Sequence, residues 1–184
     1  KIITEPKWKS WIVQTTTPLF TPEQCRQIIA SGRAQKPQQA QVGMNKPEGG
    51  TDTKKRVTTI SWIPFQEMGH MYQDLNTFIQ KANENHFGFG DIQVTEQAQF
   101  TEYPEGGFYD WHMDCDVNMG HEPPVRKISM TLLLNDPSEF EGGDLELMAP
   151  GKFANLKQGH AICFASFLNH RVNPVTRGMR QSLV

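Results

Sequence analysis

The sequence of 184 residues lacks the features that define several large classes of protein. Its three cysteines, Cys25, Cys115 and Cys163, stand singly with no CxxC pair. This pattern argues against a disulfide framework and against a structural zinc site, and it favours reduced thiols in a cytoplasmic protein. The longest apolar run, residues 161–168, is less than half as long as a membrane span. The first eleven residues have no apolar core of the kind found in signal peptides.

A strong excess of charge is also missing. The formal net charge of −2 gives no general attraction to nucleic acid or to an anionic membrane, so we expect neither as a partner. Hydrophobic residues make up 37% of the chain and charged residues 21%, which fits a globular protein and excludes a disordered one. The length suits one domain with a full core, so we expect a single domain over residues 1–184. The oligomeric state is not indicated by the sequence.

Helices are expected in the first half of the chain. Residues 21–24 (TPEQ) carry an N-cap threonine, a first-turn proline and a capping-box glutamine, so a helix should begin there and run to about Ser31. Residues 56–63 are rich in β-branched side chains and are predicted to form one strand. Residues 65–82 carry apolar side chains at steps of three and four, which predicts a second helix.

From residue 91 onward the chain turns to short β-rich runs broken by glycine and proline. Many short strands of this kind are typical of a sandwich, a barrel or a jelly roll. Because the helices precede the strands, we expect a mainly β (α+β) fold in which residues 1–90 brace the β core of residues 91–184. The predicted strands are 91–103, 125–134, 144–148, 161–165, 170–174 and 179–184.

The most informative stretch runs from Tyr103 to Asp114 (YPEGGFYDWHMD). Side chains two residues apart in a strand point to the same face, so His112 and Asp114 can reach one metal ion from one side. His170 is the best candidate for a third ligand because of the motif that follows it. Two histidines and one carboxylate on one face of Fe(II) leave three positions for a bidentate oxo-acid and O₂.

The motif that begins at His170 reads HRVNPVTRGMRQS. We predict a turn over residues 174–178, in which Gly178 takes a positive φ. This turn would place Arg180 on a strand beside that of His170, with Ser182 on the same face as Arg180. An inward guanidinium matches the distal carboxylate of an oxo-acid through two parallel hydrogen bonds, and the serine hydroxyl adds one donor.

Two further runs lie between these motifs, LND at residues 134–136 and GGDL at residues 142–145. In this order the motifs resemble the prolyl 4-hydroxylase-like 2-oxoglutarate oxygenases, most closely the bacterial and phage PKHD-type hydroxylases. The resemblance covers about residues 95–184. It implies a distorted double-stranded β-helix, which is a jelly roll braced by the N-terminal helices.

The resemblance also implies the roles of the site residues. Arg180, with help from Ser182, would anchor the distal carboxylate of 2-oxoglutarate, and Tyr103 would lie near this cofactor. At Leu133 the sequence departs from family members that carry a tyrosine on the cofactor. O₂ would be the second cosubstrate, with ascorbate as an optional reductant. Three residues would bind Fe(II): His112, Asp114 and His170.

The implied reaction is hydroxylation of a C–H bond, most simply on a peptidyl proline or another amino-acid side chain, with succinate and CO₂ as co-products. The expected partner is therefore a peptide, protein or amino-acid substrate. One alternative is a cupin-like metal enzyme that uses no oxo-acid, which Arg180 and Ser182 disfavour. Another alternative is a non-catalytic jelly-roll binding module, which an intact set of three metal ligands disfavours.

Two polar segments rich in glycine and proline, residues 33–55 and 115–124, are candidates for a lid over the pocket. Their composition predicts irregular structure, and the second segment directly follows Asp114. An aromatic rim that includes Tyr109 or Trp111 would lie under such a lid.

Overall fold

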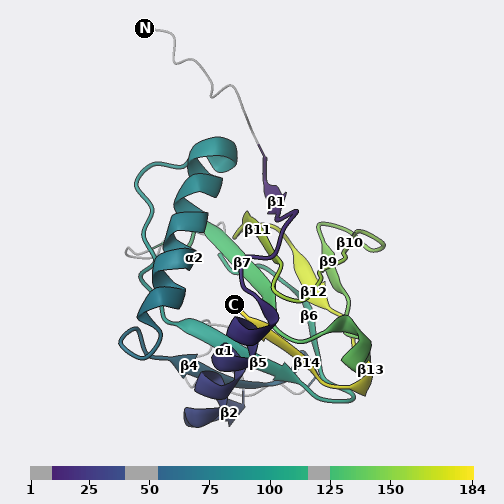
Figure 1. Cartoon of the computed structure of the whole chain (residues 1–184). Helices are drawn as coiled ribbons and strands as arrows, with labels where there is room; N and C mark the ends of the chain where they lie inside the picture. Colours follow the sequence, from purple (N-terminus) through teal and green to yellow (C-terminus); the bar gives the residue numbers. More distant parts are fainter. Residues whose placement is uncertain (1–9, 40–53, 116–124) are drawn as a thin grey trace, which may run out of the picture.

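Two antiparallel β-sheets face each other in the computed structural model (Figure 1), which describes residues 10–39, 54–115 and 125–184. The predicted mainly β architecture is confirmed. The larger sheet has the strand order β1 (Ile12–Gln14), β11 (Ala161–Ala165), β7 (Ile128–Leu133), β14 (Arg180–Leu183), β5 (Ala98–Tyr103), β4 (Thr59–Ile63) and β2 (Gln38–Gln39). The smaller sheet has the order β10 (Phe153–Ala154), β9 (Leu145–Leu147), β12 (His170–Val172), β6 (Phe108–His112) and β3 (Arg56–Val57). A separate ladder joins β8 (Phe140–Gly142) to β13 (Val175–Gly178).

The helices pack against the larger sheet (Figure 1). They are α1 (Pro22–Ala34) and α2 (Gly69–Ala82), which is followed by a π-helical turn (Asn83–Phe87). A short 3₁₀ turn (Pro137–Glu139) precedes β8 and has no buried residue. The predicted second helix thus begins at Gly69 and not at residue 65. None of the helices in the described part of the chain has the length and apolar character needed to cross a membrane.

Helix α1 begins as the sequence predicts and ends later. The backbone N–H of Gln24 donates to Thr21 Oγ1 at 3.2 Å and that of Thr21 to Gln24 Oε1 at 2.9 Å, so the capping box is confirmed. The helix continues past Ser31 because Gly32 is a packing residue there and not a helix stop. A Cβ atom at Gly32 would lie 2.3 Å from Phe100 Cγ, so the missing side chain lets α1 approach β5 closely.

Two apolar cores lie on the two faces of the larger sheet. One packs against the helices and the other fills the space between the sheets. Alternation along β5 shows the division: Phe100 belongs to the helical core, whereas Tyr103 belongs to the core between the sheets. The larger sheet therefore presents an inner face to the smaller sheet, and Thr101, Tyr103, Arg180 and Ser182 lie on that face.

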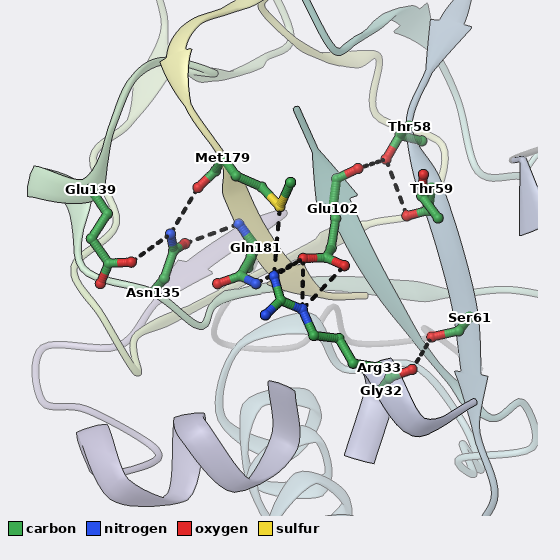
Figure 2. A network of polar contacts seen from close by, with 10 residues as sticks. All are labelled: Gly32, Arg33, Thr58, Thr59, Ser61, Glu102, Asn135, Glu139, Met179 and Gln181. Atoms are coloured by element: carbon green, nitrogen blue, oxygen red, sulfur yellow. Dashed lines mark hydrogen bonds and ion pairs between the residues drawn. The ribbon is translucent and has the colours of Figure 1, made fainter. Parts of the chain in front are cut away.

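A polar network ties the end of α1 to the outer face of the larger sheet (Figure 2). Arg33 Nη2 lies 2.7 Å from Glu102 Oε2, and Gln181 Nε2 donates to the same oxygen at 2.8 Å. Glu102 belongs to β5 and Gln181 to β14. The network therefore fixes α1 to the strand that carries Arg180.

The segment 56–63, predicted as one strand, is divided between the two sheets. Strand β3 pairs with β6 in the smaller sheet, and β4 pairs with β5 in the larger. The chain crosses at Thr58, whose hydroxyl donates to the carbonyl of Glu102 at 2.7 Å. A continuous β-branched run contains no glycine or proline to mark this crossing. The first 90 residues consequently contribute strands to both sheets.

The predicted turn over residues 174–178 is wrong, although Gly178 takes the expected positive φ of 72°. Residues 175–178 form β13, which pairs with β8. Arg180 is also not on a strand beside that of His170: β14 lies between β7 and β5, whereas β12 lies between β9 and β6. The extra strand gives the chain the length to pass from one sheet to the other. His170 and Arg180 therefore belong to facing sheets.

Candidate metal and cofactor site

The three predicted metal ligands converge at one end of the smaller sheet. His112 ends β6 and stands opposite His170 of β12, and Asp114 follows in the bend after β6. The ligand atoms of all three lie within 4.8 Å of one another. The Nε2 atom of each histidine is 3.6 Å from Asp114 Oδ1. Two ligands bound at about 2.1 Å to one ion are typically about 3–3.5 Å apart, so small shifts would complete a metal site.

Asp114 is oriented by backbone contacts and not by the alternation of a strand. Its N–H donates to the carbonyl of Ser166 at 3.0 Å, and the N–H of Cys115 donates to the same oxygen at 3.0 Å. Ser166 precedes β12, which begins at His170. The loop that leads to the third ligand thus holds the second ligand in place. Cys25, Cys115 and Cys163 form no disulfide with one another.

Both histidines are fixed in one tautomer by backbone carbonyls. His112 Nδ1 lies 2.7 Å from the carbonyl oxygen of Asp110, and His170 Nδ1 lies 3.0 Å from that of Leu168. Since a carbonyl can only accept, each Nδ1 carries the hydrogen and each Nε2 keeps a lone pair directed toward Asp114. The His112 side chain is only 9% exposed and that of His170 only 7%. Burial, together with the neighbouring His170, lowers the pKa of His112, so its neutral, ligand-competent form is favoured.

Arg180 occupies a buried position on the inner face of β14, where only 3% of the residue is exposed. Its Nη1 donates to Ser182 Oγ at 3.1 Å, and that hydroxyl is 2.5 Å from Thr101 Oγ1. The Arg180 Cζ atom is 5.6 Å from the centroid of the Tyr103 ring, on the neighbouring strand. The structure thus brings together the three residues predicted to contact the cofactor.

None of the carboxylates of the described residues lies within 4 Å of the Arg180 guanidinium, and Asp144 acts on it only from farther away. Burial lowers the pKa of Arg180, but an arginine keeps its charge at physiological pH. A buried positive charge without a partner is costly, and an anionic ligand would offset that cost. The position therefore fits the distal carboxylate of an oxo-acid.

The role of the LND run could not be predicted from its sequence. Asn135 Oδ1 accepts from the N–H of Gln181 at 2.9 Å, and Asn135 Nδ2 donates to the carbonyl of Met179 at 2.8 Å. Figure 2 shows these contacts with the chain on either side of Arg180. Asn135 therefore holds the backbone before and after Arg180, which positions its side chain. Leu133 pairs with Ser182 and is buried. Where some family members carry a tyrosine, this chain therefore has an apolar side chain beside Ser182 and the expected position of the distal carboxylate.

Gly143, in the GGDL run, supports Arg180 from the side. Its φ is +66°, and a Cβ atom there would lie 2.9 Å from Arg180 Cδ. We expect Gly143→Ala to displace Arg180, to weaken oxo-acid binding about 10-fold and to lower the free energy of unfolding by about 1–3 kcal/mol. Denaturant unfolding and calorimetric titration of the metal-loaded protein with 2-oxoglutarate measure the two effects.

Gly151→Ala is the matched control, because Gly151 has a φ of +84° and no atom within 4 Å of the Cβ position. In this variant an alanine takes a positive φ but contacts no other atom, so its stability should fall while its affinity for the oxo-acid stays that of the wild type. An equal loss of oxo-acid affinity in both variants would contradict the contact argument.

The two aromatic candidates for the pocket rim lie in different surroundings. The Tyr109 ring stacks on His112, with centroids 3.4 Å apart and planes at 11°. The Trp111 ring instead lies 4.9 Å from the guanidinium of Arg171, which points away from the inner face because its neighbour His170 points toward it. Of these two candidates, Tyr109 is the one beside a metal ligand. Of the two predicted lid segments, residues 40–53 and 116–124 lie outside the described residues.

Comparison with known sequences matches residues 98–184 to the family model of the 2OG-Fe(II) oxygenase superfamily. A PKHD-type hydroxylase of Colwellia psychrerythraea is 34% identical over 142 residues, which cover 74% of this chain and 62% of that protein. A PKHD-type hydroxylase of Xylella fastidiosa is 41% identical over 95 residues, 47% of this chain and 41% of that protein. The chain spans 38%, 64% and 49% of the lengths of the first three curated relatives it matches.

Solved structures share the fold over nearly the whole chain. A prolyl-4-hydroxylase of Pseudomonas putida superimposes with a TM-score of 0.69 at 22% identity, covering 94% of this chain and 89% of that one. The viral collagen prolyl hydroxylase of Paramecium Bursaria Chlorella virus-1, in its 2OG complex, gives 0.72 at 18% identity, with 95% and 93% covered. A Trichoplax adhaerens prolyl hydroxylase in complex with a hypoxia inducible factor peptide fragment gives 0.69 at 18% identity, with 94% and 81% covered. The predicted distorted double-stranded β-helix is confirmed.

Proposed function

We propose that the protein is an Fe(II)- and 2-oxoglutarate-dependent dioxygenase, because residues 98–184 match the family model of the 2OG-Fe(II) oxygenase superfamily. The observation that carries the proposal is the pairing of two features between the sheets. The ligand atoms of His112, Asp114 and His170 converge within 4.8 Å, and the buried guanidinium of Arg180 has no carboxylate of the described residues within 4 Å. We further propose that the chain acts as one oxygenase domain, with strands from both halves building the site.

Each site residue has a task that its surroundings support. His112, Asp114 and His170 would hold Fe(II), and the carbonyls that fix the imidazoles keep their Nε2 lone pairs available. Arg180 and Ser182 would bind the distal carboxylate of 2-oxoglutarate by charge-assisted hydrogen bonds. When bound, iron and 2-oxoglutarate supply the oxidation of a C–H bond by O₂, with succinate and CO₂ as co-products. His170 and Arg180 are buried, which limits the access of water to this space.

The substrate is proposed to be a peptidyl proline or another amino-acid side chain, presented by a peptide, a protein or a free amino acid. Support comes from the shared fold with prolyl hydroxylases, one of which is solved in complex with a peptide fragment. Tyr109, stacked on His112, offers an aromatic surface beside the position where such a side chain would meet the metal.

Succinate formation tests the proposed function. The purified protein is incubated with Fe(II), 2-oxoglutarate and O₂, with and without ascorbate, and with and without proline-rich peptides, and succinate is quantified. We expect succinate to require both Fe(II) and 2-oxoglutarate and to increase with a true substrate. Binding of 2-oxoglutarate without succinate would favour a non-catalytic binding module. A lack of 2-oxoglutarate binding would favour a cupin-like metal enzyme.

A further inference from the structure

A second arginine lies beside the metal ligands and has no task in the proposed function. Arg56 of β3 stands opposite Tyr109 of β6 in the smaller sheet. Its Cζ atom is 4.3 Å from the centroid of the Tyr109 ring, and that ring stacks on His112 with centroids 3.4 Å apart. A single aromatic ring therefore separates the Arg56 guanidinium from a metal ligand.

The hydrogen bonds and charge of Arg56 are incompletely satisfied. Its Nη2 donates to Gln99 Oε1 at 3.0 Å, but its Nε is buried without a partner. Among the described residues this Nε is the one buried side-chain nitrogen or oxygen in that condition. No carboxylate of the described ranges lies within 4 Å of the Arg56 guanidinium. A buried donor left unpaired is unfavourable, so the position favours a ligand that accepts from it.

Arg126, another arginine near the site, differs from Arg56 because its charge is paired with a carboxylate. Arg126 Nη1 lies 3.5 Å from the carbonyl oxygen of Asp114, so it also reaches the metal end of the sheet. Its guanidinium, however, is paired with both carboxylate oxygens of Glu96, at 2.6 and 2.8 Å. The charge of Arg126 is thus balanced by Glu96, whereas that of Arg56 is not paired with any carboxylate of residues 10–39, 54–115 and 125–184.

Arg56 and Arg180 contact strand β5 at two separate points. Gln99, which binds Arg56, and Tyr103, which stands opposite Arg180, lie four residues apart on one face of β5. Four residues of strand span about 13 Å, well beyond the length of a five-carbon dicarboxylate. Because these points are separate, we assign the anion that Arg56 would accept to a molecule other than the one held at Arg180.

We propose that Arg56 is a specificity-determining residue that binds a carboxylate of the substrate, close to the C–H bond that is oxidised. The inference rests on the proposed function and names its substrate class, namely amino-acid units that carry a free carboxylate. Two sources share this chemistry: the side chain of an acidic residue in a peptide, and the α-carboxylate of a free amino acid. The planar guanidinium, with its unpaired Nε–H, matches either carboxylate.

The test measures binding first, with matched acids and amides. Protein loaded with Zn(II) and 2-oxoglutarate is titrated calorimetrically with two pairs of probes. One pair is a capped Pro-Asp peptide and its Pro-Asn counterpart, and the other is free proline and prolinamide. We expect the acid of one pair to bind at least about 10-fold more tightly than its amide, since a hydrogen bond to a charged group is stronger than one to a neutral amide. The pair that shows the difference identifies the source of the carboxylate.

Variants of Arg56 then show whether this residue causes the preference for the acid over the amide. Arg56→Gln should remove the acid preference, and Arg56→Lys should keep part of it because the charge remains without the planar fork. Arg177→Gln is the control, because Arg177 is an exposed arginine of β13 paired with Glu141. It should keep the full preference. Thermal unfolding of all three variants checks that each is folded.

Three results would overturn the proposal. In the first, neither acid binds better than its amide to the loaded wild-type protein. In the second, Arg56→Gln leaves the preference intact. In the third, succinate assays show that Arg56→Gln lowers kcat equally for acid and amide with KM unchanged, as expected if Arg56 only supports the Tyr109–His112 stack. A failure of the proposed function looks different, because 2-oxoglutarate would then either not bind the metal-loaded protein at the loading step or bind without any formation of succinate, and both proposals would fall.

Discussion

Replacing Asp114 with alanine is expected to abolish iron-dependent turnover. Asp114 is the one anionic member of the ligand set, and its Oδ1 faces the Nε2 atoms of His112 and His170 at 3.6 Å. Loss of a residue that merely supports a metal ligand typically costs 10- to 100-fold, so loss of a ligand should cost at least about 100-fold in metal affinity. Metal content after dialysis and the rate of succinate formation measure the two losses.

Asp110→Ala provides the matched control for this variant. Asp110 is an exposed carboxylate on the same strand, and the carbonyl that it offers to His112 Nδ1 is retained in the variant. It should therefore bind metal as the wild type does. If Asp114→Ala kept its iron and its activity, the site would have to be sought elsewhere in the chain.

Replacing Arg180 with lysine is expected to weaken 2-oxoglutarate binding by about 10- to 100-fold while leaving metal affinity unchanged. An ammonium group keeps the charge but cannot reproduce the planar fork that pairs with a carboxylate. It would also lose the fixed contact to Ser182, at present 3.1 Å from Arg180 Nη1. Because a ligand that binds only the folded state raises its stability, the increase in melting temperature with 2-oxoglutarate should be smaller in the variant.

Arg177→Lys separates a local effect from a general one. Arg177 lies three residues before Arg180, is exposed, and pairs with Glu141 at 3.0 Å. Its replacement should leave both 2-oxoglutarate affinity and stability nearly unchanged, because exposed ion pairs contribute little. Unaltered 2-oxoglutarate affinity in Arg180→Lys would show that another group binds the distal carboxylate.

The sequence predicts those features that depend on local chemistry. The capping box at Thr21, the apolar stripe of the second helix and the positive φ of Gly178 each follow from a few neighbouring residues. The grouping of His112, Asp114 and His170 was also predicted, since residue types and motif order suffice for it.

Sheet membership could not be predicted, because it depends on partners far away in the chain. Period-two patterns show which side chains share a face, but they do not show which strand lies beside which. For this reason the crossing at Thr58 and the placement of β12 and β14 in different sheets were missed. The same holds for Asn135, which bonds the backbone of Gln181 across 46 residues. The close fit of Gly143 to Arg180 likewise exists only in the folded chain.

The carbonyls that set the two imidazole tautomers have a consequence for how the site tolerates genetic change. They belong to Asp110 and Leu168, each two residues before the histidine that it orients. Every amino acid carries this carbonyl, so substitutions at either position preserve the group that directs Nε2 to the metal. If a carboxylate side chain accepted the Nδ1 hydrogen bond instead, each histidine would depend on one further residue that could not be replaced. Lineages that carry this fold can therefore diversify positions 110 and 168 while keeping the orientation of both metal ligands.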